Sequence, residues 1–242
     1  ELAANAVNPV TGEALNLTKL DIKGLGKAKY ILKEGGTLGD LYTTSNLRFN
    51  DNGYVEVDKN GNLLMTDEGE DIYLGSVFPN HNLAWRNDFS YKGINLGVLF
   101  TARLGGVCYS ATQANLDLYG VSEASAAARD AGGVLINGRE MVDAQKWYQA
   151  IGSQSGLPQY YLYSATNVRL QELSLGYTFP RKWFRNKLGL TVSFVGRNLW
   201  MIYCKAPFDP EAVASTGLNY QGIDYFMMPS MRNLGFNVKF QF

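Results

Sequence analysis

The sequence predicts an all-β chain whose antiparallel strands form part of a transmembrane β-barrel. Several segments alternate between apolar and polar side chains, which is the period of a strand with one apolar face. Short and long links between these segments alternate along the chain. Tyr (15), Phe (12) and Gly (26) are abundant while Pro is scarce (7), a mixture that suits aromatic-bearing strands joined by tight turns.

Composition excludes several other classes of protein. No apolar run approaches the roughly 18 residues of a membrane helix, whereas a barrel strand needs only about 9 to 11 alternating residues. Lys plus Arg equals Asp plus Glu at 22 each, so no basic footprint for nucleic acid exists. Two Cys and one His are too few for a clustered metal site, and we expect no cofactor.

The first expected strands lie in the N-terminal half. A weak strand is expected between residues 21 and 33, where two glycines dilute the alternation. Residues 83–91 and 94–104 both alternate and are separated only by Lys92 and Gly93. Because glycine supplies the positive φ of a two-residue turn, these two segments are predicted to pair as a hairpin.

Three more strands are expected in the C-terminal half. Residues 169–179 alternate, but the phase slips around Gln171 and Glu172, which marks either a bulge or the exit from the apolar layer. Residues 187–203 form the next strand. The segment from 230 to the C-terminus has one wholly apolar and one wholly polar face.

The connections predict how the strands are oriented. The short links are 92–93 and 180–186, and the long ones cover approximately 34–81, 105–165 and 204–229. A bacterial barrel has short periplasmic turns and long extracellular loops, so the long links are expected outside and the C-terminus in the periplasm. The aromatic side chains then expected to form a girdle at the inner interface are Tyr177, Phe179, Trp183, Phe184 and Phe242.

Within the long links some local structure is expected. Ser122 is predicted to cap a helix that runs to Arg129, and residues 141–151 are predicted to form another helix. Residues 50–64 contain two Asn-Gly turn signals and are predicted to form a small hairpin.

Three sets of residues are candidates for function. Charged side chains on the inward face could contact a plug or line the substrate route, or else be solvated charges and wall salt bridges; they are Arg86, Asp88, Arg103, Arg197 and Lys239. Aromatic side chains of the long loop could meet a substrate or partner, or else pack locally; they are Trp147, Tyr148, Tyr160, Tyr161 and Tyr163. The terminal aromatic residues, which could signal barrel assembly or merely complete an apolar face, are Phe240 and Phe242.

Other titratable residues favour structural roles. Asp209 and Glu211 could suggest a glycosidase pair, but nothing supplies a cleft between them, so a role in loop structure is expected. His81 has no companion ligand and is expected at the surface. Cys108 and Cys204 are expected on the same side of the membrane, and a bridge between them would require a Cα separation below about 7 Å.

Several segments together resemble the C-terminal region of the SusC/RagA family of TonB-dependent outer-membrane transporters of the Bacteroidetes. They are LQELSLGYTFP (170–180), GRNLW (196–200), FDPE (208–211), EGGTLGDLY (34–42), FSYKGINL (89–96) and the terminal strand ending in Phe242. Their order and spacing are those of the family, and the likeness covers nearly the whole chain.

The resemblance implies a fold and partners that composition alone does not. Residues 1–242 would supply about the last six strands of a 22-stranded plugged barrel, without the plug or the TonB-contacting segment. The family implies no enzymatic activity; it implies import of oligosaccharides or peptides, a SusD-like surface lipoprotein as cap, energy from the TonB complex, and contact with outer-membrane lipid. The competing interpretation is a soluble all-β glycan-binding module, which would also use aromatic loops.

Overall fold

The computed structural model describes residues 7, 10–12, 19–66, 69–215, 217 and 220–242. The chain divides into two compact units. We call the first the loop unit, which comprises the described residues of Glu1–Phe78, Val107–Tyr163 and Val213–Met227. The second is the sheet unit, Pro79–Gly106, Ser164–Ala212 and Met228–Phe242.

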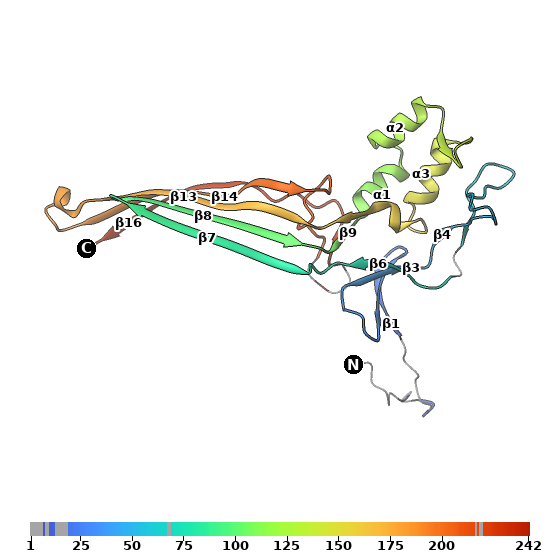
Figure 1. The fold of residues 1–242 in the computed structure, drawn as a ribbon, viewed down its shortest axis with the longest axis horizontal. Coiled ribbons are helices and arrows are strands. Elements are labelled where there is room, and N and C mark those ends of the chain that lie inside the picture. The colour runs from blue at the N-terminus through green and yellow to red at the C-terminus, as the bar shows by residue number, and fades with distance from the viewer. Residues whose placement is uncertain (1–6, 8–9, 13–18, 67–68, 216, 218–219) are drawn as a thin grey trace. The chain divides into compact units, whose positions relative to one another are not determined.

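The sheet unit is built on one antiparallel sheet of long strands (Figure 1). Its five strands lie in the order β16-β14-β13-β8-β7, so neighbours in space are largely neighbours in sequence. Their bounds are β7 His81–Tyr91, β8 Ile94–Leu104, β13 Asn167–Phe179, β14 Gly189–Cys204 and β16 Asn233–Gln241. These are the five strongest strands predicted from the alternation.

The turns of this sheet follow from local chemistry. β7 and β8 are joined through Lys92 and Gly93 at φ +50° and +90°, so the predicted two-residue hairpin is confirmed. Between β13 and β14 lies a single 3₁₀ turn, η2 Arg181–Phe184, which ends at Arg185 in the left-handed region. Both turns lie at the same end of the sheet, since the Thr178 backbone N–H donates to the Gly93 carbonyl at 2.7 Å.

The sixth expected strand does not join this sheet. Residues 21–33 instead form the hairpin of β1 (Lys19–Leu25) and β2 (Ala28–Lys33), which turns at Gly26 with φ +59°. Tyr30 and Ile31 are adjacent yet both buried, so β2 is covered on both faces and is not a lipid-facing strand. The hairpin continues into a four-stranded sheet with β3 (Asp40–Thr43) and β6 (Ile72–Ser76).

The loop unit has its own hydrophobic core, assembled from segments that are far apart in the sequence. Tyr30, Leu41, Tyr109, Leu157 and Ile223 are among its buried members. A small sheet in the order β12-β9-β15 joins three of these segments, with bounds β9 Val107–Ser110, β12 Leu162–Ser164 and β15 Ile223–Asp224. The predicted loops are therefore a folded unit.

Three helices pack in the loop unit, α1 Ala111–Leu118, α2 Glu123–Asp130 and α3 Ala144–Gly152. The prediction for α2 is confirmed, because the Ser122 side chain accepts from the Ser125 backbone N–H at 3.0 Å. The helix predicted from residue 141 begins three residues later, since Asp143 caps it and residues 140–142 form a strand instead. Helix α1 lies in the same long link, but no helix was predicted at its residues.

Small hairpins complete the loop unit. They are β4 (Asn46–Leu47) with β5 (Met65–Thr66), and β10 (Val134–Ile136) with β11 (Glu140–Val142); 3₁₀ turn η1 covers Pro158–Tyr161. Bridges Phe49↔Val55 and Val57↔Leu63 confirm β structure in the predicted 50–64 hairpin. Among the described residues, no helix combines the length and the hydropathy that a membrane crossing requires.

Candidate functional site

A row of charged side chains crosses the polar face of the sheet. Arg86 of β7 donates to Glu172 of β13 (Nη1 to Oε1, 3.5 Å), and Arg197 of β14 donates to the other oxygen of Glu172 (Nε to Oε2, 3.0 Å). Arg86 also pairs with Asp88 (Nε to Oδ2, 2.9 Å). We call Arg86, Asp88, Glu172 and Arg197 the charge cluster; in it, three of the five predicted inward residues meet.

Strand register explains why these residues meet. Arg86 lies opposite Leu99, Leu99 opposite Glu172, and Glu172 opposite Arg197, so the row runs straight across four strands. The register shifts between Leu170 and Glu172 in both pairings of β13, and this bulge turns the Glu172 carboxylate toward the polar face. Of the two explanations left open for the phase slip, the structure shows the bulge.

The other two predicted inward residues lie apart from the cluster. Arg103 of β8 lines an open groove of about 440 Å³ together with Thr101, Gln171 and Glu211. Lys239 of β16 is exposed and lies opposite Thr191. The sheet's polar face therefore carries charge along its length.

A buried ion pair fastens the link between β14 and β16 to β13. Arg169 is only 3% exposed and donates to Asp209 (Nη1 to Oδ2, 3.0 Å) and to Ser230 Oγ (3.3 Å). Ser230 in turn donates to Asp209, and Asn167 accepts from Arg169 Nε at 3.0 Å. We call Arg169, Asp209 and Ser230 the loop clamp. Glu211 reaches Arg169 at 3.4 Å but is largely exposed.

The clamp sets the charge state of Asp209. Burial raises the pKa of its carboxyl, but hydrogen bonds from Arg169, Ser230 and the Glu211 backbone lower that pKa by more, so it lies below its ordinary value. The expected structural role for Asp209 is confirmed by these contacts. An ionised carboxylate held by a guanidinium is also unsuited to acid catalysis.

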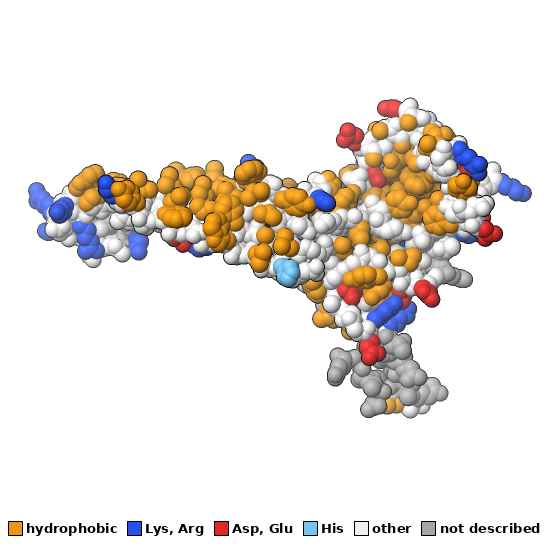
Figure 2. Space-filling model, viewed as in Figure 1, with side chains coloured by type: hydrophobic (Ala, Val, Ile, Leu, Met, Phe, Trp, Pro, Cys, Tyr) orange, Lys and Arg blue, Asp and Glu red, His pale blue; other side chains and the backbone are white. Residues whose placement is uncertain are grey.

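The opposite face of the sheet is apolar and uncovered. Trp85 is 62% exposed and stacks on Phe100 at 5.6 Å, and Phe194 contacts Phe236 at 5.5 Å. Figure 2 shows hydrophobic side chains gathered along the length of this sheet. Phe240 and Phe242 belong to the same exposed set, at 56% and 100%. Of the buried hydrophobic residues in the described chain, only Ala165 and Ala206 lie in the sheet unit.

The predicted aromatic residues of the long loop divide between core and surface. Tyr161 is 2% exposed and belongs to the core of the loop unit, which favours the packing alternative for this tyrosine. Trp147 packs partly against that core and meets Tyr160 edge-on at 6.0 Å. Tyr160 is 46% exposed, while Tyr163 is half-buried.

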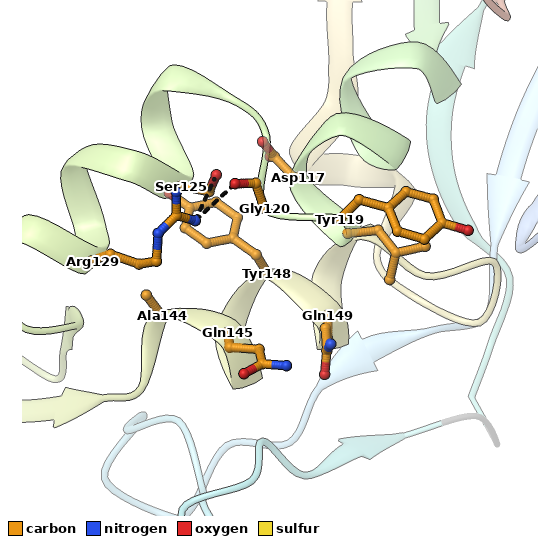
Figure 3. A pocket seen from close by; sticks show the side chains of 10 residues that line it. Asp117, Tyr119, Gly120, Ser125, Arg129, Ala144, Gln145, Tyr148 and Gln149 are labelled. Atoms are coloured by element: carbon orange, nitrogen blue, oxygen red, sulfur yellow. Dashed lines mark hydrogen bonds between the residues drawn. The ribbon is translucent and has the colours of Figure 1, made fainter.

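Tyr148 lines a pocket of about 260 Å³ between the three helices (Figure 3). Gln145 and Gln149 lie on the same helix, α3, and line it as well. Arg129 closes one side, donating to the Gly120 carbonyl at 2.8 Å and to Ser125 Oγ at 3.5 Å. The pocket is small, its lining is mixed polar and apolar, and its arginine already donates to two groups of the chain.

Cys108, Cys204 and His81 are not members of the charge cluster or of the loop clamp. Cys108 and Cys204 do not form a disulfide, and the Cys204 thiol donates to the Ala206 carbonyl at 3.5 Å. His81 begins β7 and is exposed, as expected.

Comparison with known proteins finds relatives in sequence and in structure. No family model matches. "TonB-dependent receptor P3" of Formosa agariphila is 26% identical over 198 residues, covering 77% of this chain and 19% of its own length. A chain in the structure of the RagAB peptide transporter matches with a TM-score of 0.53 and 19% identity, covering 94% of this chain and 25% of its own.

The chain thus spans about a fifth of the curated relative and a quarter of the solved chain. The solved structure supports the fold, and the curated relative supports the likeness in sequence. The predicted resemblance to the SusC/RagA family is therefore confirmed: the chain is similar in sequence to a TonB-dependent receptor and similar in fold to a chain of the RagAB peptide transporter.

Proposed function

We propose that the chain supplies the C-terminal part of the barrel wall of a bacterial outer-membrane transporter that imports oligosaccharides or peptides. One observation carries this proposal: a single-layer sheet with an uncovered apolar face and a charged opposite face. A sheet in water must bury its apolar face against a second layer. In a bilayer, lipid covers that face while the lumen side stays polar.

The size of the uncovered surface makes this argument quantitative. Phe236 is 81% exposed, Leu234 66% and Phe89 60%. Fully burying one such side chain stabilises a protein by about 1.5–3 kcal/mol. Leaving the whole apolar face in contact with water would therefore be strongly unfavourable. The competing soluble glycan-binding module would need a second sheet or helices over these strands.

The charge cluster supports a water-filled or plug-filled interior. Arg86, Glu172 and Arg197 form linked ion pairs on the polar face of the sheet. Such charges are tolerated where water or polar groups contact them. The import role itself would need the rest of the barrel. Oligosaccharide or peptide would pass the polar face, driven by the TonB complex acting on a region outside this chain.

The partners are proposed from the relatives. The solved relative is a chain in the structure of the RagAB peptide transporter, and the resemblance to the SusC/RagA family implies a surface lipoprotein of the SusD type as cap on the long-loop side. Exposed aromatic residues such as Tyr160 suit contact with that cap or with substrate. Bond chemistry forms no part of this proposal, since one relative is named a receptor and the other a transporter.

A fractionation and uptake experiment on the full-length transporter tests the proposal. The protein should sediment with the outer membrane, require detergent for extraction, and take up labelled oligosaccharide or peptide only in cells with an intact TonB complex. A TonB-deficient strain is the control for passive entry. Recovery of the full-length protein as a detergent-free soluble species would refute the proposal.

A further inference from the structure

The short-turn end of the sheet carries a dense group of positive charge. Its members, which we call the basic turn surface, are Lys92, Arg181, Lys182, Arg185 and Lys187, and all are exposed. No Asp or Glu occurs in the three segments that make up this end, residues 89–96, 173–196 and 233–242. Figure 2 shows Lys and Arg side chains gathered there, at the end of the sheet that bears the C-terminus in Figure 1.

Backbone hydrogen bonds hold the turn that carries all of these cations except Lys92. The Trp183 N–H donates to the Pro180 carbonyl at 3.0 Å, and the Asn186 N–H donates to the Arg181 carbonyl at 3.0 Å. The Lys187 N–H donates to the Phe184 carbonyl at 3.1 Å. Like charges gathered on two turns at the same end of the sheet repel one another, so this group favours binding of anions.

An aromatic layer lies directly beside the cations. Phe179 contacts Tyr177, Trp183 and Phe184, with ring centroids 4.9, 5.8 and 6.5 Å apart. Trp183 is 67% exposed. Tyr and Trp rings of membrane proteins lie at the headgroup level, so the cations next to them lie at the depth of lipid phosphates.

We propose that the basic turn surface binds the headgroups of anionic phospholipids, such as phosphatidylglycerol, in the leaflet that the short turns meet. The proposal rests on the membrane location in the proposed function. Two observations support lipid binding: the positive charge of the basic turn surface complements the negative charge of the headgroups, and this surface is continuous with the apolar, lipid-facing side of the sheet. Clusters of Lys and Arg beside a membrane-embedded segment attract anionic lipid.

Lipid retention by the full-length transporter tests this inference. The protein is reconstituted in nanodiscs made from equal parts of phosphatidylglycerol and phosphatidylcholine, and the lipids it retains are counted by native mass spectrometry. The test variant combines R181Q, K182Q, R185Q and K187Q. Its matched control combines K23Q, K59Q, K205Q and R232Q, which removes as many exposed cations elsewhere.

Wild type and control should both retain phosphatidylglycerol in preference to phosphatidylcholine. In the test variant the ratio of the two retained lipids should fall by about tenfold or more, since each nearby cation contributes ~5-fold to the affinity for anionic lipid. Raising the salt concentration should weaken the wild-type preference, a result that does not depend on the variant folding. A wild type without preference, or a test variant that keeps it, overturns the inference. Either result leaves outer-membrane fractionation, and so the proposed function, intact.

Discussion

At the scale of single residues, Glu172 holds two guanidinium groups on the polar face. Replacing it with Gln leaves Arg86 and Arg197 without their shared carboxylate. Ion pairs open to water contribute about 0–1 kcal/mol each, so E172Q should lower the free energy of unfolding of the full-length barrel by about 1 kcal/mol. Urea unfolding of the transporter, followed by gel migration of the folded form, measures this change.

The control for this prediction is E70Q, which removes an exposed carboxylate of the loop unit. Its unfolding midpoint should equal that of the wild type. An E172Q midpoint that matches the control would mean that the cluster contributes nothing to stability.

Asp209 should matter more, because its partner is buried. D209N removes the buried counter-charge of the Arg169 guanidinium, which is 3% exposed, and leaves only the exposed Glu211 beside it; breaking a buried pair typically costs about 3–5 kcal/mol. The local readout is hydrogen exchange and protease cleavage in residues 204–229 at neutral pH. E211Q is the matched control, since Glu211 lies farther from Arg169 (3.4 Å) and is largely exposed; it should change protection little.

The clamp should also make this link sensitive to acid. The pKa of Asp209 is lowered in the folded protein, so the clamp contributes its stability above the unfolded value of about 3.9 and loses it as pH falls through the lower folded value. Protection of residues 204–229 in the wild type should therefore decline toward that of D209N only in strong acid. Equal protection of the two proteins at neutral pH would contradict this account.

At the scale of elements, the two faces of a strand should tolerate opposite substitutions. On β16, Phe236 lies on the apolar face and Asn237, its neighbour, on the polar face. An arginine on the lipid side costs about 2–4 kcal/mol at mid-membrane, whereas one on the lumen side meets water. F236R should therefore sharply reduce the amount of folded transporter in the outer membrane, and N237R should leave it near wild type.

The comparison of these two variants is its own control, since both add the same side chain one residue apart. The measurement is the folded fraction in membrane preparations, from migration of unheated samples on gels. Equal loss for both variants would show that β16 does not have lipid on one side only.

Alternation predicted the strands of the sheet well because a half-buried strand repeats every two residues. It failed for residues 21–33 because β2 buries adjacent residues, Tyr30 and Ile31, and so shows no alternation. It also missed Glu172, since the bulge after Leu170 shifts the phase at that residue. The slip itself was the available signal, but a slip does not say which neighbours a carboxylate will meet.

At the scale of the whole molecule, the loop unit was the part that sequence patterns could not predict. Its core joins Tyr30, Tyr109 and Ile223, which come from three separate stretches of the chain. Periodicity reports which residues of one element share a face, not which distant segments pack together. The long links were therefore expected as loops with small local elements. Helix α2 and the β structure in 50–64 were predicted with their type and place, and α3 was predicted as a helix with its start three residues too early.

The two units should respond separately to loss of the loop-unit core. Ile223 is 0% exposed in that core, so I223A should destabilise the loop unit by about 2–5 kcal/mol. The sheet unit has almost no buried apolar residues and depends on backbone pairing and, in our proposal, on lipid. I223A should therefore speed protease cleavage within residues 107–163 while the barrel still migrates as folded. Y225A, at a 48% exposed neighbour, should leave both the cleavage rate and the folded barrel as in the wild type. If I223A abolished the folded barrel as well, the loop unit would be required for the sheet to form.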